Sequence, residues 1–514
     1  MRYNEYRTYD AVGLAELVAK GEVRPTELLE VASARCAQVN PEINAISLRM
    51  DEAGQAAAAR PNEGPFAGVP FLLKDLGQDF AGYPTASGTG PLRKVKADNN
   101  STVVQRWIDA GLVIFGKTTT PEFGAVAVTE TRTYGATRNP WNLDHTPGGS
   151  SGGSGAAVAA GIVPMAGASD GGGSIRIPAA CTGLFGLKPG RGLVPAGPDF
   201  AENIFGAATA GVLSRSVRDS AVMLDLLSEP DPGGPYLADR SAQSYAAAVH
   251  TPPRRLRIGF THESPLGAPV HAEAVRAVEA TAALLAQLGH HVEVAAPRMD
   301  SRQMAHDFMT VWTANLAARL AHARKVSGAS ESDFDLITRV VAAAGRAHSA
   351  TALIEAHGRW NTYTRALSEF HGTYDLLLTP TLAEPPLRIG QTKPPAAVEK
   401  IMAMLLELRA GTAITRTPTY RDLVLTNLAP VPFTQLANVT GRPAMSVPLH
   451  HTADGLPLGT QFVGPLGSEF LLLQLAAQLE QAQPWSHLEP PLAPAVAGMD
   501  PAGDGDGREA SGDR

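Results

Sequence analysis

Apolar residues recur along this chain in two patterns, one typical of helices and one of short buried strands. Apolar positions at helical spacing predict an N-terminal helix that Pro41 is expected to end; they are Leu28, Val31, Ala32, Cys36 and Val39. A second helix is predicted over residues 101–110, closed by Gly111 and followed by a strand over 112–115. The same helix–glycine–strand order recurs over residues 272–295. Strands that alternate with helices indicate an α/β sheet with helices on both faces.

Other segments extend this picture. Short apolar runs predict further strands over residues 69–73, 256–260 and 375–378. Helical patterns over residues 301–372 and 396–409 predict an appended helical layer. The C-terminal residues 495–514 are rich in Gly, Asp and Ala with almost no apolar content, so we expect a disordered tail.

Composition narrows the possible functions. The 514 residues carry a net charge of −7 without any block of Lys and Arg, so we expect no nucleic-acid partner. The N-terminus lacks the apolar core of a signal peptide, and no apolar run approaches the ~20 residues that span a bilayer. A cytoplasmic protein without membrane contact is therefore predicted. The two cysteines, Cys36 and Cys181, are expected to be small buried side chains.

The candidate chemistry lies in two glycine-rich segments, 147–155 and 169–176, and in a lysine, Lys74, that ends the apolar run 69–73. Clustered glycines mark backbone that approaches something closely or adopts unusual conformations. Burial can lower the pKa of a lysine enough for it to act as a base for a serine nucleophile. The alternative for Lys74 is a surface lysine, which the preceding apolar run disfavours. We interpret these groups as the base, relay and nucleophile of a hydrolase.

The second glycine segment offers successive backbone N–H groups, from Gly171, Gly172, Gly173 and Ser174, to a developing oxyanion. The alternatives are a flexible linker and a phosphate-binding loop. The apolar residues that follow, such as Ile175 and Ile177, disfavour a linker, and the Gly-Lys-Ser/Thr ending of a phosphate loop is missing.

Together, Lys74, the Gly-Gly-Ser-Ser-Gly-Gly-Ser segment and the Ser-Asp-Gly-Gly-Gly-Ser-Ile-Arg-Ile-Pro segment resemble the amidase signature family in type and spacing. Residues 117–124, 137–142, 186–189 and 441–444 are also similar to that family. The resemblance therefore implies a single amidase-signature domain over 1–494 around a central mixed, twisted sheet. Its signature core is expected over about 65–215, with a helical insert over about 301–372.

The resemblance also implies site residues and a mechanism. Ser174 is the expected nucleophile, Ser150 a bridging serine on a cis peptide, and Lys74 the base. Ser151 is expected to hydrogen-bond within this triad, whereas Asp170 and Arg176 are expected to brace the loop. Amide hydrolysis would proceed through an acyl-enzyme without a metal or an organic cofactor.

Within the family, the chain is similar to bacterial 6-aminohexanoate-cyclic-dimer hydrolases and to amidases of aryl or linear amides. Ala125 stands where an Asn is expected in the cyclic-dimer enzymes, which removes a polar substrate contact. Trp312 belongs to a helical insert whose counterpart approaches the nucleophile, although it could also be ordinary core packing. A small, mainly apolar amide substrate follows, with esters or carbamates as side substrates, and a homodimer is compatible with the sequence.

Two alternatives remain at this stage. The A subunit of a glutamyl-tRNA amidotransferase shares the triad, but typically has Gln where this chain has Ile177. Release of ammonia from glutamine with a partner subunit would discriminate it. A non-catalytic scaffold on the amidase fold would be expected to lose triad members, whereas Lys74, Ser150 and Ser174 are all present.

Overall fold

The computed structural model describes residues 1–60, 62–236, 240–408 and 418–492. Its main sheet is built from β1 (Ile46–Arg49), β2 (Pro70–Lys74), β3 (Val113–Thr118), β6 (Met165–Asp170), β7 (Phe185–Lys188), β8 (Thr209–Ser214), β9 (Arg257–Phe260), β10 (His291–Val294), β11 (Leu376–Pro380), β12 (Ala444–Val447) and β13 (Thr460–Val463). In the described part of the chain these strands lie in the order β1-β3-β2-β6-β8-β7-β12-β13-β11-β9-β10. A separate hairpin pairs β4 (Glu130–Thr131) with β5 (Gly135–Ala136).

The sheet is mixed. Strands β3, β2 and β6 run parallel to one another, as do β11, β9 and β10. The remaining neighbours are antiparallel. The predicted α/β class with a mixed central sheet is therefore confirmed.

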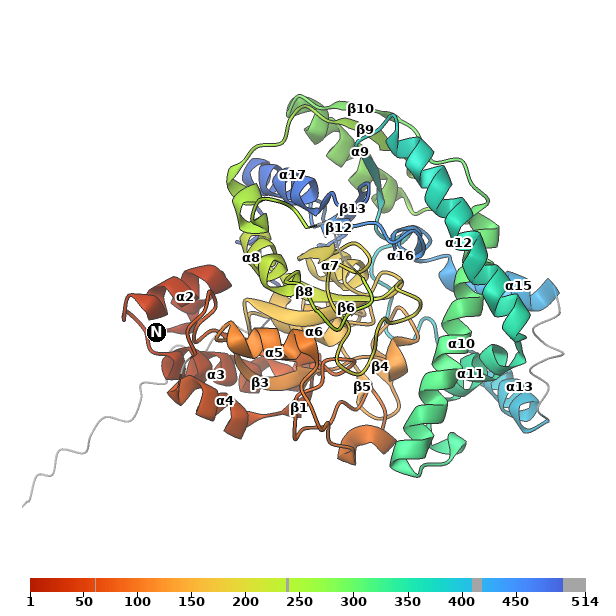
Figure 1. Ribbon diagram of the computed structural model, residues 1–514, viewed down its shortest axis with the longest axis horizontal. Coiled ribbons are helices and arrows are strands. Elements are labelled where there is room, and N and C mark those ends of the chain that lie inside the picture. Colours follow the sequence, from red (N-terminus) through yellow and green to blue (C-terminus); the bar gives the residue numbers. More distant parts are fainter. Residues whose placement is uncertain (61, 237–239, 409–417, 493–514) are drawn as a thin grey trace, which may run out of the picture.

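Helices surround this sheet (Figure 1). They are α1 (Tyr3–Tyr6), α2 (Ala11–Ala19), α3 (Pro25–Ile43), α4 (Asp51–Ala59), α5 (Thr102–Asp109), α6 (Gly152–Ala159), α7 (Arg176–Thr182), α8 (Val217–Leu227), α9 (Ala272–Gln287), α10 (Ser301–Ser327), α11 (Leu336–Ala347), α12 (Ala350–His371), α13 (Ala396–Glu407), α15 (Pro418–Leu428), α16 (Gln435–Val439) and α17 (Glu469–Ala482). Short 3₁₀ turns are η1 (Pro91–Lys94), η2 (Glu122–Gly124), η3 (Tyr245–His250) and η4 (Glu331–Asp333).

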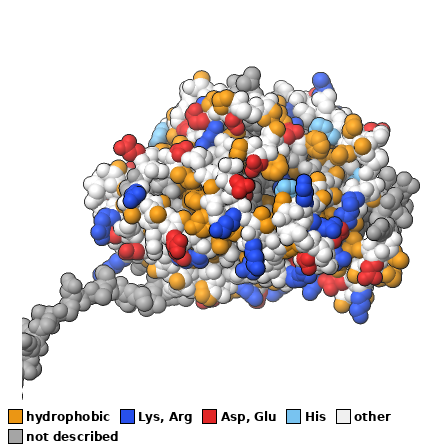
Figure 2. Space-filling model, turned by 60° about the horizontal axis from the view of Figure 1, so that its bottom comes forward, with side chains coloured by type: hydrophobic (Ala, Val, Ile, Leu, Met, Phe, Trp, Pro, Cys, Tyr) orange, Lys and Arg blue, Asp and Glu red, His pale blue; other side chains and the backbone are white. Residues whose placement is uncertain are grey.

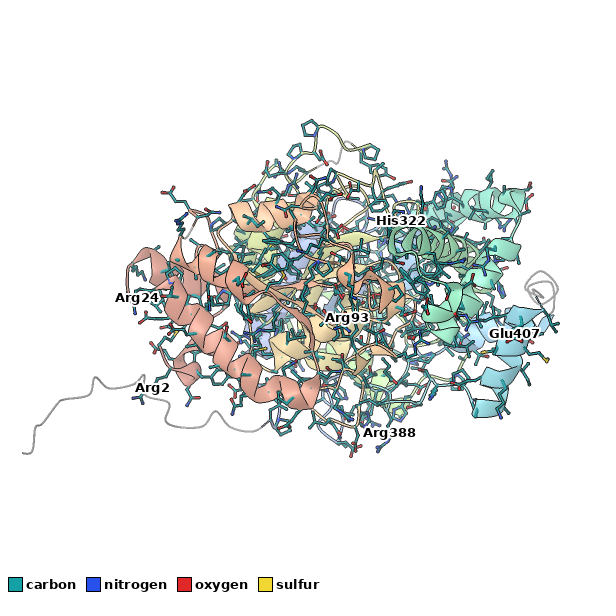
Figure 3. The ribbon with its side chains drawn as sticks, turned by 90° about the horizontal axis from the view of Figure 1, so that it is seen from below. Arg2, Arg24, Arg93, His322, Arg388 and Glu407 are labelled. Atoms are coloured by element: carbon teal, nitrogen blue, oxygen red, sulfur yellow. The ribbon has the colours of Figure 1, made fainter. Side chains whose placement is uncertain are left out.

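The predicted helical layer is present at one side of the sheet. Helix α10 packs against α11, α12 and α15, and α13 packs against α11. Figure 3 shows this layer, which carries His322 and Glu407, at the opposite end of the molecule from the N-terminal helices around Arg24. The predicted tail, 495–514, lies outside the described residues.

One helix boundary differs from its prediction. Helix α3 continues past Asn40 to Ile43 and contains Pro41, which was expected to end it. Ile43 is fully buried, and the Asn40 carboxamide oxygen accepts N–H groups from Ala45 and Ile46 at 2.8 and 3.1 Å. Burial of Ile43 and these local hydrogen bonds stabilise the end of the helix, although proline removes one backbone donor.

Strand β2 lies inside the sheet, between β3 and β6. All five residues of β2 are buried, and the Phe71 ring packs against Trp107 of α5 with centroids 5.0 Å apart. Both Cys36 and Cys181 are buried, as predicted. An apolar strand buried on both faces therefore carries Lys74 at its end.

The surface adds little to the prediction of function. Figure 2 shows acidic and basic side chains interspersed over one face, without a continuous band of either sign. Among the described residues, no helix combines the length and apolar character that a membrane span requires.

Candidate active site

Lys74 lies at the carboxyl end of β2 with its side chain fully buried. Its Nζ lies 2.8 Å from Ser150 Oγ, 3.0 Å from Ser169 Oγ and 3.4 Å from the Ser169 carbonyl oxygen. Burial lowers the pKa of Lys74 to about 7, although the Asp170 carboxylate acts in the opposite direction. A lysine with this pKa can be neutral near neutral pH and accept a proton.

Ser150 lies in the first glycine segment, just before α6. The Gly149–Ser150 peptide bond is cis, the geometry that the family resemblance implied. Gly149 fits because the backbone passes very close by: a Cβ there would lie 2.9 Å from the Val128 nitrogen. The close packing of Gly149 on the backbone at Val128 thus helps to hold Ser150, whose hydroxyl faces Lys74.

Ser174 lies in the turn between β6 and α7 and is 8% exposed. Its hydroxyl makes no hydrogen bond to any described residue, so it is not engaged elsewhere. The structure joins Lys74 to Ser150 directly, whereas a hydrogen bond between Ser150 and Ser174 is not formed within the described chain.

The second glycine segment differs from the prediction at one position. The Gly173 N–H donates to Asp170 Oδ1 at 2.7 Å and is therefore occupied inside the loop. The N–H groups of Gly171, Gly172 and Ser174 make no hydrogen bond within the described residues. The Gly173 N–H is occupied because the Asp170 carboxylate lies beneath the turn and accepts inward-pointing N–H groups, including that of Ile175 at 3.2 Å.

Asp170 and Arg176 form a completely buried ion pair. Arg176 Nη2 lies 2.9 Å from Asp170 Oδ1, and Arg176 Nε lies 2.9 Å from Oδ2. Burial alone would raise the pKa of Asp170, but the Arg176 guanidinium outweighs it and holds that pKa well below its usual range. These contacts fit the bracing role expected of both residues.

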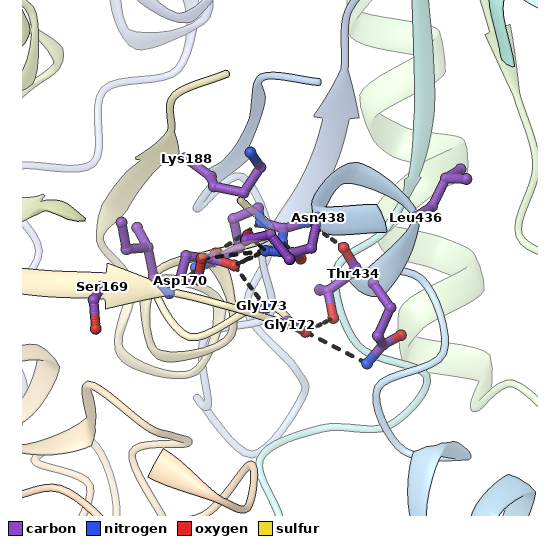
Figure 4. Close-up of polar contacts among 12 residues, drawn as sticks. Ser169, Asp170, Gly172, Gly173, Lys188, Thr434, Leu436 and Asn438 are labelled. Carbon is purple, nitrogen blue, oxygen red and sulfur yellow. Dashed lines mark hydrogen bonds and ion pairs between the residues drawn. The ribbon is translucent and has the colours of Figure 1, made fainter. Parts of the chain in front are cut away.

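The remaining contacts of Arg176 come from the far end of the chain, which sequence reasoning missed. Arg176 donates to the Thr434 carbonyl oxygen (2.8 Å), Asn438 Oδ1 (2.6 Å) and Gln461 Oε1 (2.6 Å). The Thr434 hydroxyl donates to the Gly172 carbonyl oxygen at 2.6 Å, as Figure 4 shows. Polar residues within an otherwise apolar stretch, 431–439, were the one available indication.

Ser151 also differs from its expected place. Its hydroxyl donates to the Ser169 carbonyl oxygen and accepts the Ser169 N–H, both at 3.3 Å, and makes no hydrogen bond to Lys74, Ser150 or Ser174. Ser151 therefore holds the backbone of Ser169, a residue that sequence reasoning did not single out although it contacts Lys74.

Two aromatic side chains of α10 lie against the glycine loop. Phe308 and Trp312 pack with ring centroids 5.4 Å apart. A Cβ added to Gly171 would lie 3.2 Å from Trp312, and one added to Gly172 would lie 2.9 Å from Phe308. Trp312 is half-buried and lies against Gly171.

Ala125 lies beside a turn that packs on Ser150. It follows Gly124, where an added Cβ would lie 3.0 Å from Ser150 Oγ, so this turn packs directly on the serine. Ala125 itself is half-buried against an apolar cluster that includes Phe123 and Phe334. Among the described residues, no group of three or more His, Cys, Asp or Glu side chains could hold a metal ion.

Comparisons with known proteins identify the family of this chain. A model of the family described as Amidase matches residues 27–473. The 6-aminohexanoate-cyclic-dimer hydrolase of Pseudomonas sp. (strain NK87) is 38% identical over 498 residues, covering 94% of this chain and 96% of that protein.

Two solved structures are also similar. A 6-aminohexanoate cyclic dimer hydrolase complexed with substrate matches with a TM-score of 0.84 and 36% identity, over 94% of this chain and 98% of that one. A bacterial aryl acylamidase of the amidase signature family matches with a TM-score of 0.80 and 29% identity, over 93% and 97%. On the evidence of its sequence and its fold, this chain belongs to the amidase family and is an amidase.

Proposed function

We propose that this amidase hydrolyses a carboxylic amide through Lys74, Ser150 and Ser174, with a covalent acyl-enzyme on Ser174. The observation that carries the proposal is the 2.8 Å contact between the fully buried Lys74 Nζ and Ser150 Oγ. A buried amine with a pKa of about 7 is suited to accept a proton that a serine hydroxyl passes on.

The proposed reaction begins with two coupled proton transfers. Neutral Lys74 accepts the Ser150 proton while Ser150 accepts the Ser174 proton, and Ser174 Oγ bonds to the carbonyl carbon. The N–H groups of Gly171, Gly172 and Ser174 stabilise the oxyanion, whereas that of Gly173 is held by Asp170. The proton returns through Ser150 to the leaving nitrogen as the C–N bond breaks. Water then hydrolyses the Ser174 ester and frees the acid.

The acyl or leaving-group pocket is proposed to be mainly apolar. The Phe308–Trp312 pair lies against the glycine loop, and Ala125, beside the turn that packs on Ser150, offers no polar side chain. Aryl and linear amides fit this pocket better than a cyclic diamide that needs a polar contact at position 125. The similarity to an aryl acylamidase supports the same substrate class. Esters and carbamates undergo the same acyl transfer and are proposed side substrates.

The first prediction concerns the triad. Ser174→Ala should abolish amide turnover and labelling by a fluorophosphonate probe, because the attacking oxygen is gone. Lys74→Met should lower kcat about 100- to 10,000-fold, the usual contribution of a general base. Ser446→Ala is the control, since this buried serine of β12 contacts Thr381 and is not one of the proposed reacting residues. Turnover by folded Ser174→Ala at the wild-type rate would refute the assignment.

The second prediction concerns pH. Because protonated Lys74 cannot accept a proton, kcat/KM should fall as the pH drops through about 7 and should level off above it. The Lys74→Met variant should lack this ionisation, and chelators should leave the profile unchanged. A profile that rises only near the ordinary lysine pKa of about 10.4, or activity that a chelator removes and zinc restores, would contradict the proposal.

The third prediction separates two roles for Trp312. As a pocket wall, Trp312→Ala should change the ranking of anilides, aliphatic amides and acetamide with little loss of melting temperature. As core packing, it would instead lower stability by ~3–5 kcal/mol and leave the ranking unchanged. Trp360→Ala is the matched control, because Trp360 is buried in the core of the same helical layer. Identical substrate rankings in Trp312→Ala and wild type would exclude the pocket role.

A further inference from the structure

A glutamine side chain is buried beside Lys74. Gln78 lies in the loop after β2, four residues beyond Lys74, and is 1% exposed. Its Oε1 accepts the backbone N–H of Lys74 at 2.6 Å, and its Nε2 donates to the carbonyl oxygen of Ala168 in β6 at 3.0 Å. One side-chain amide therefore joins the strand of the proposed base to the neighbouring strand.

The position of this amide matches an interruption in the sheet. Strands β2 and β6 pair at a single residue pair, Leu72 with Ala166. Beyond it, the Gln78 carboxamide lies between Lys74 and Ala168 in place of direct pairing. A carboxamide can donate and accept at once, so it satisfies both backbone groups, which neither an apolar nor an acidic side chain of this length does.

Two further contacts fix Gln78 from other strands. Lys117 of β3 donates from Nζ to the backbone carbonyl oxygen of Gln78 at 3.1 Å and to Thr85 Oγ1 at 2.6 Å. On the β6 side, Gly167 leaves the room that the carboxamide occupies, because a Cβ there would lie 2.3 Å from Gln78 Oε1. The Gln78 carboxamide therefore occupies space that a side chain at position 167 would take.

The spacing of these strands decides where the lysine reaches. Ser169, directly after Ala168, supplies the hydroxyl 3.0 Å from Lys74 Nζ, and Ser150 supplies the one at 2.8 Å. Ser151, next to Ser150 along the chain, is hydrogen-bonded to the Ser169 backbone. A shift between β2 and β6 would therefore alter both distances. Misplacement of a catalytic group by about 1 Å can cost about 100-fold in rate.

We infer that Gln78 is a positioning residue, which sets the separation of β2 and β6 and thereby aims Lys74 at Ser150. This inference rests on the proposed role of Lys74 as the base. Gln78 itself lies behind the lysine backbone and is assigned no contact with the substrate.

The test begins with Gln78→Met, which keeps the length of the side chain and removes both hydrogen bonds. We expect kcat to fall about 10- to 100-fold. Since binding groups are untouched, KM should stay within about twofold of wild type. Fluorophosphonate labelling of Ser174 should slow in parallel, and the Lys74 amide hydrogen should exchange faster with deuterium. The control is Gln478→Met on α17, which removes a hydrogen bond to His290 Nε2 at 2.8 Å outside the site.

A second variant tests the same geometry without changing Gln78. Gly167→Ala should displace the carboxamide and lower kcat, as Gln78→Met does. Introduced into Gln78→Ala, the same substitution should cost less, because the atom that it would strike is gone. Additive losses in this cycle, or an unchanged kcat in folded Gln78→Met, would overturn the inference. Lys74→Met separates the two proposals: if it retains activity, the triad assignment fails, whereas an inactive Lys74→Met beside a fully active Gln78→Met refutes only the role of Gln78.

Discussion

The burial of the Lys74 amine is the constraint on which the rest of the site depends. Water is kept away by an apolar strand, and the nearest oxygens are the uncharged groups of Ser150 and Ser169. The carboxylate that acts on it, Asp170, is held by Arg176 in a two-point contact, and no ion pair to Lys74 occurs among the described residues. Because burial penalises the charged ammonium and no carboxylate pairs with it directly, its pKa is low.

The Asp170–Arg176 pair therefore has two effects. It shapes the glycine loop by collecting inward N–H groups, and it pairs the carboxylate that raises the pKa of Lys74 with a guanidinium. Removing one partner of a buried ion pair is costly, since the other is left without compensation. Asn438, Thr434 and Gln461 complete the polar shell of this pair. Residues near the C-terminal end of the described chain thus complete the surroundings of a loop that contains the proposed nucleophile, Ser174.

Features encoded locally could be predicted from the sequence. The local sequence indicates a buried strand that ends in Lys74, because the residues before it are apolar. It also indicates close backbone approach around Ser150 and Ser174, because these serines lie among glycines. The helix–glycine–strand order indicates the sheet and its helical cover in the same way.

Contacts between side chains and backbone could not be predicted. The Asp170 carboxylate accepts the N–H of Gly173, and the Ser151 hydroxyl binds the backbone of Ser169. Helix α3 continues through Pro41, and just beyond it the Asn40 carboxamide accepts backbone N–H groups. The role of Gln78 could not be predicted either, since one of its two side-chain partners, Ala168, lies ninety residues away along the chain.

A direct titration of Lys74 tests the central claim. Protein containing ¹³C-labelled lysine would be followed by NMR across the pH range, with the Lys74 resonance assigned by its loss in Lys74→Met. The structure predicts a midpoint at about 7, set by burial. A midpoint near the ordinary lysine value of about 10.4 would contradict the account, because the amine would then be protonated under the conditions in which it must act as a base.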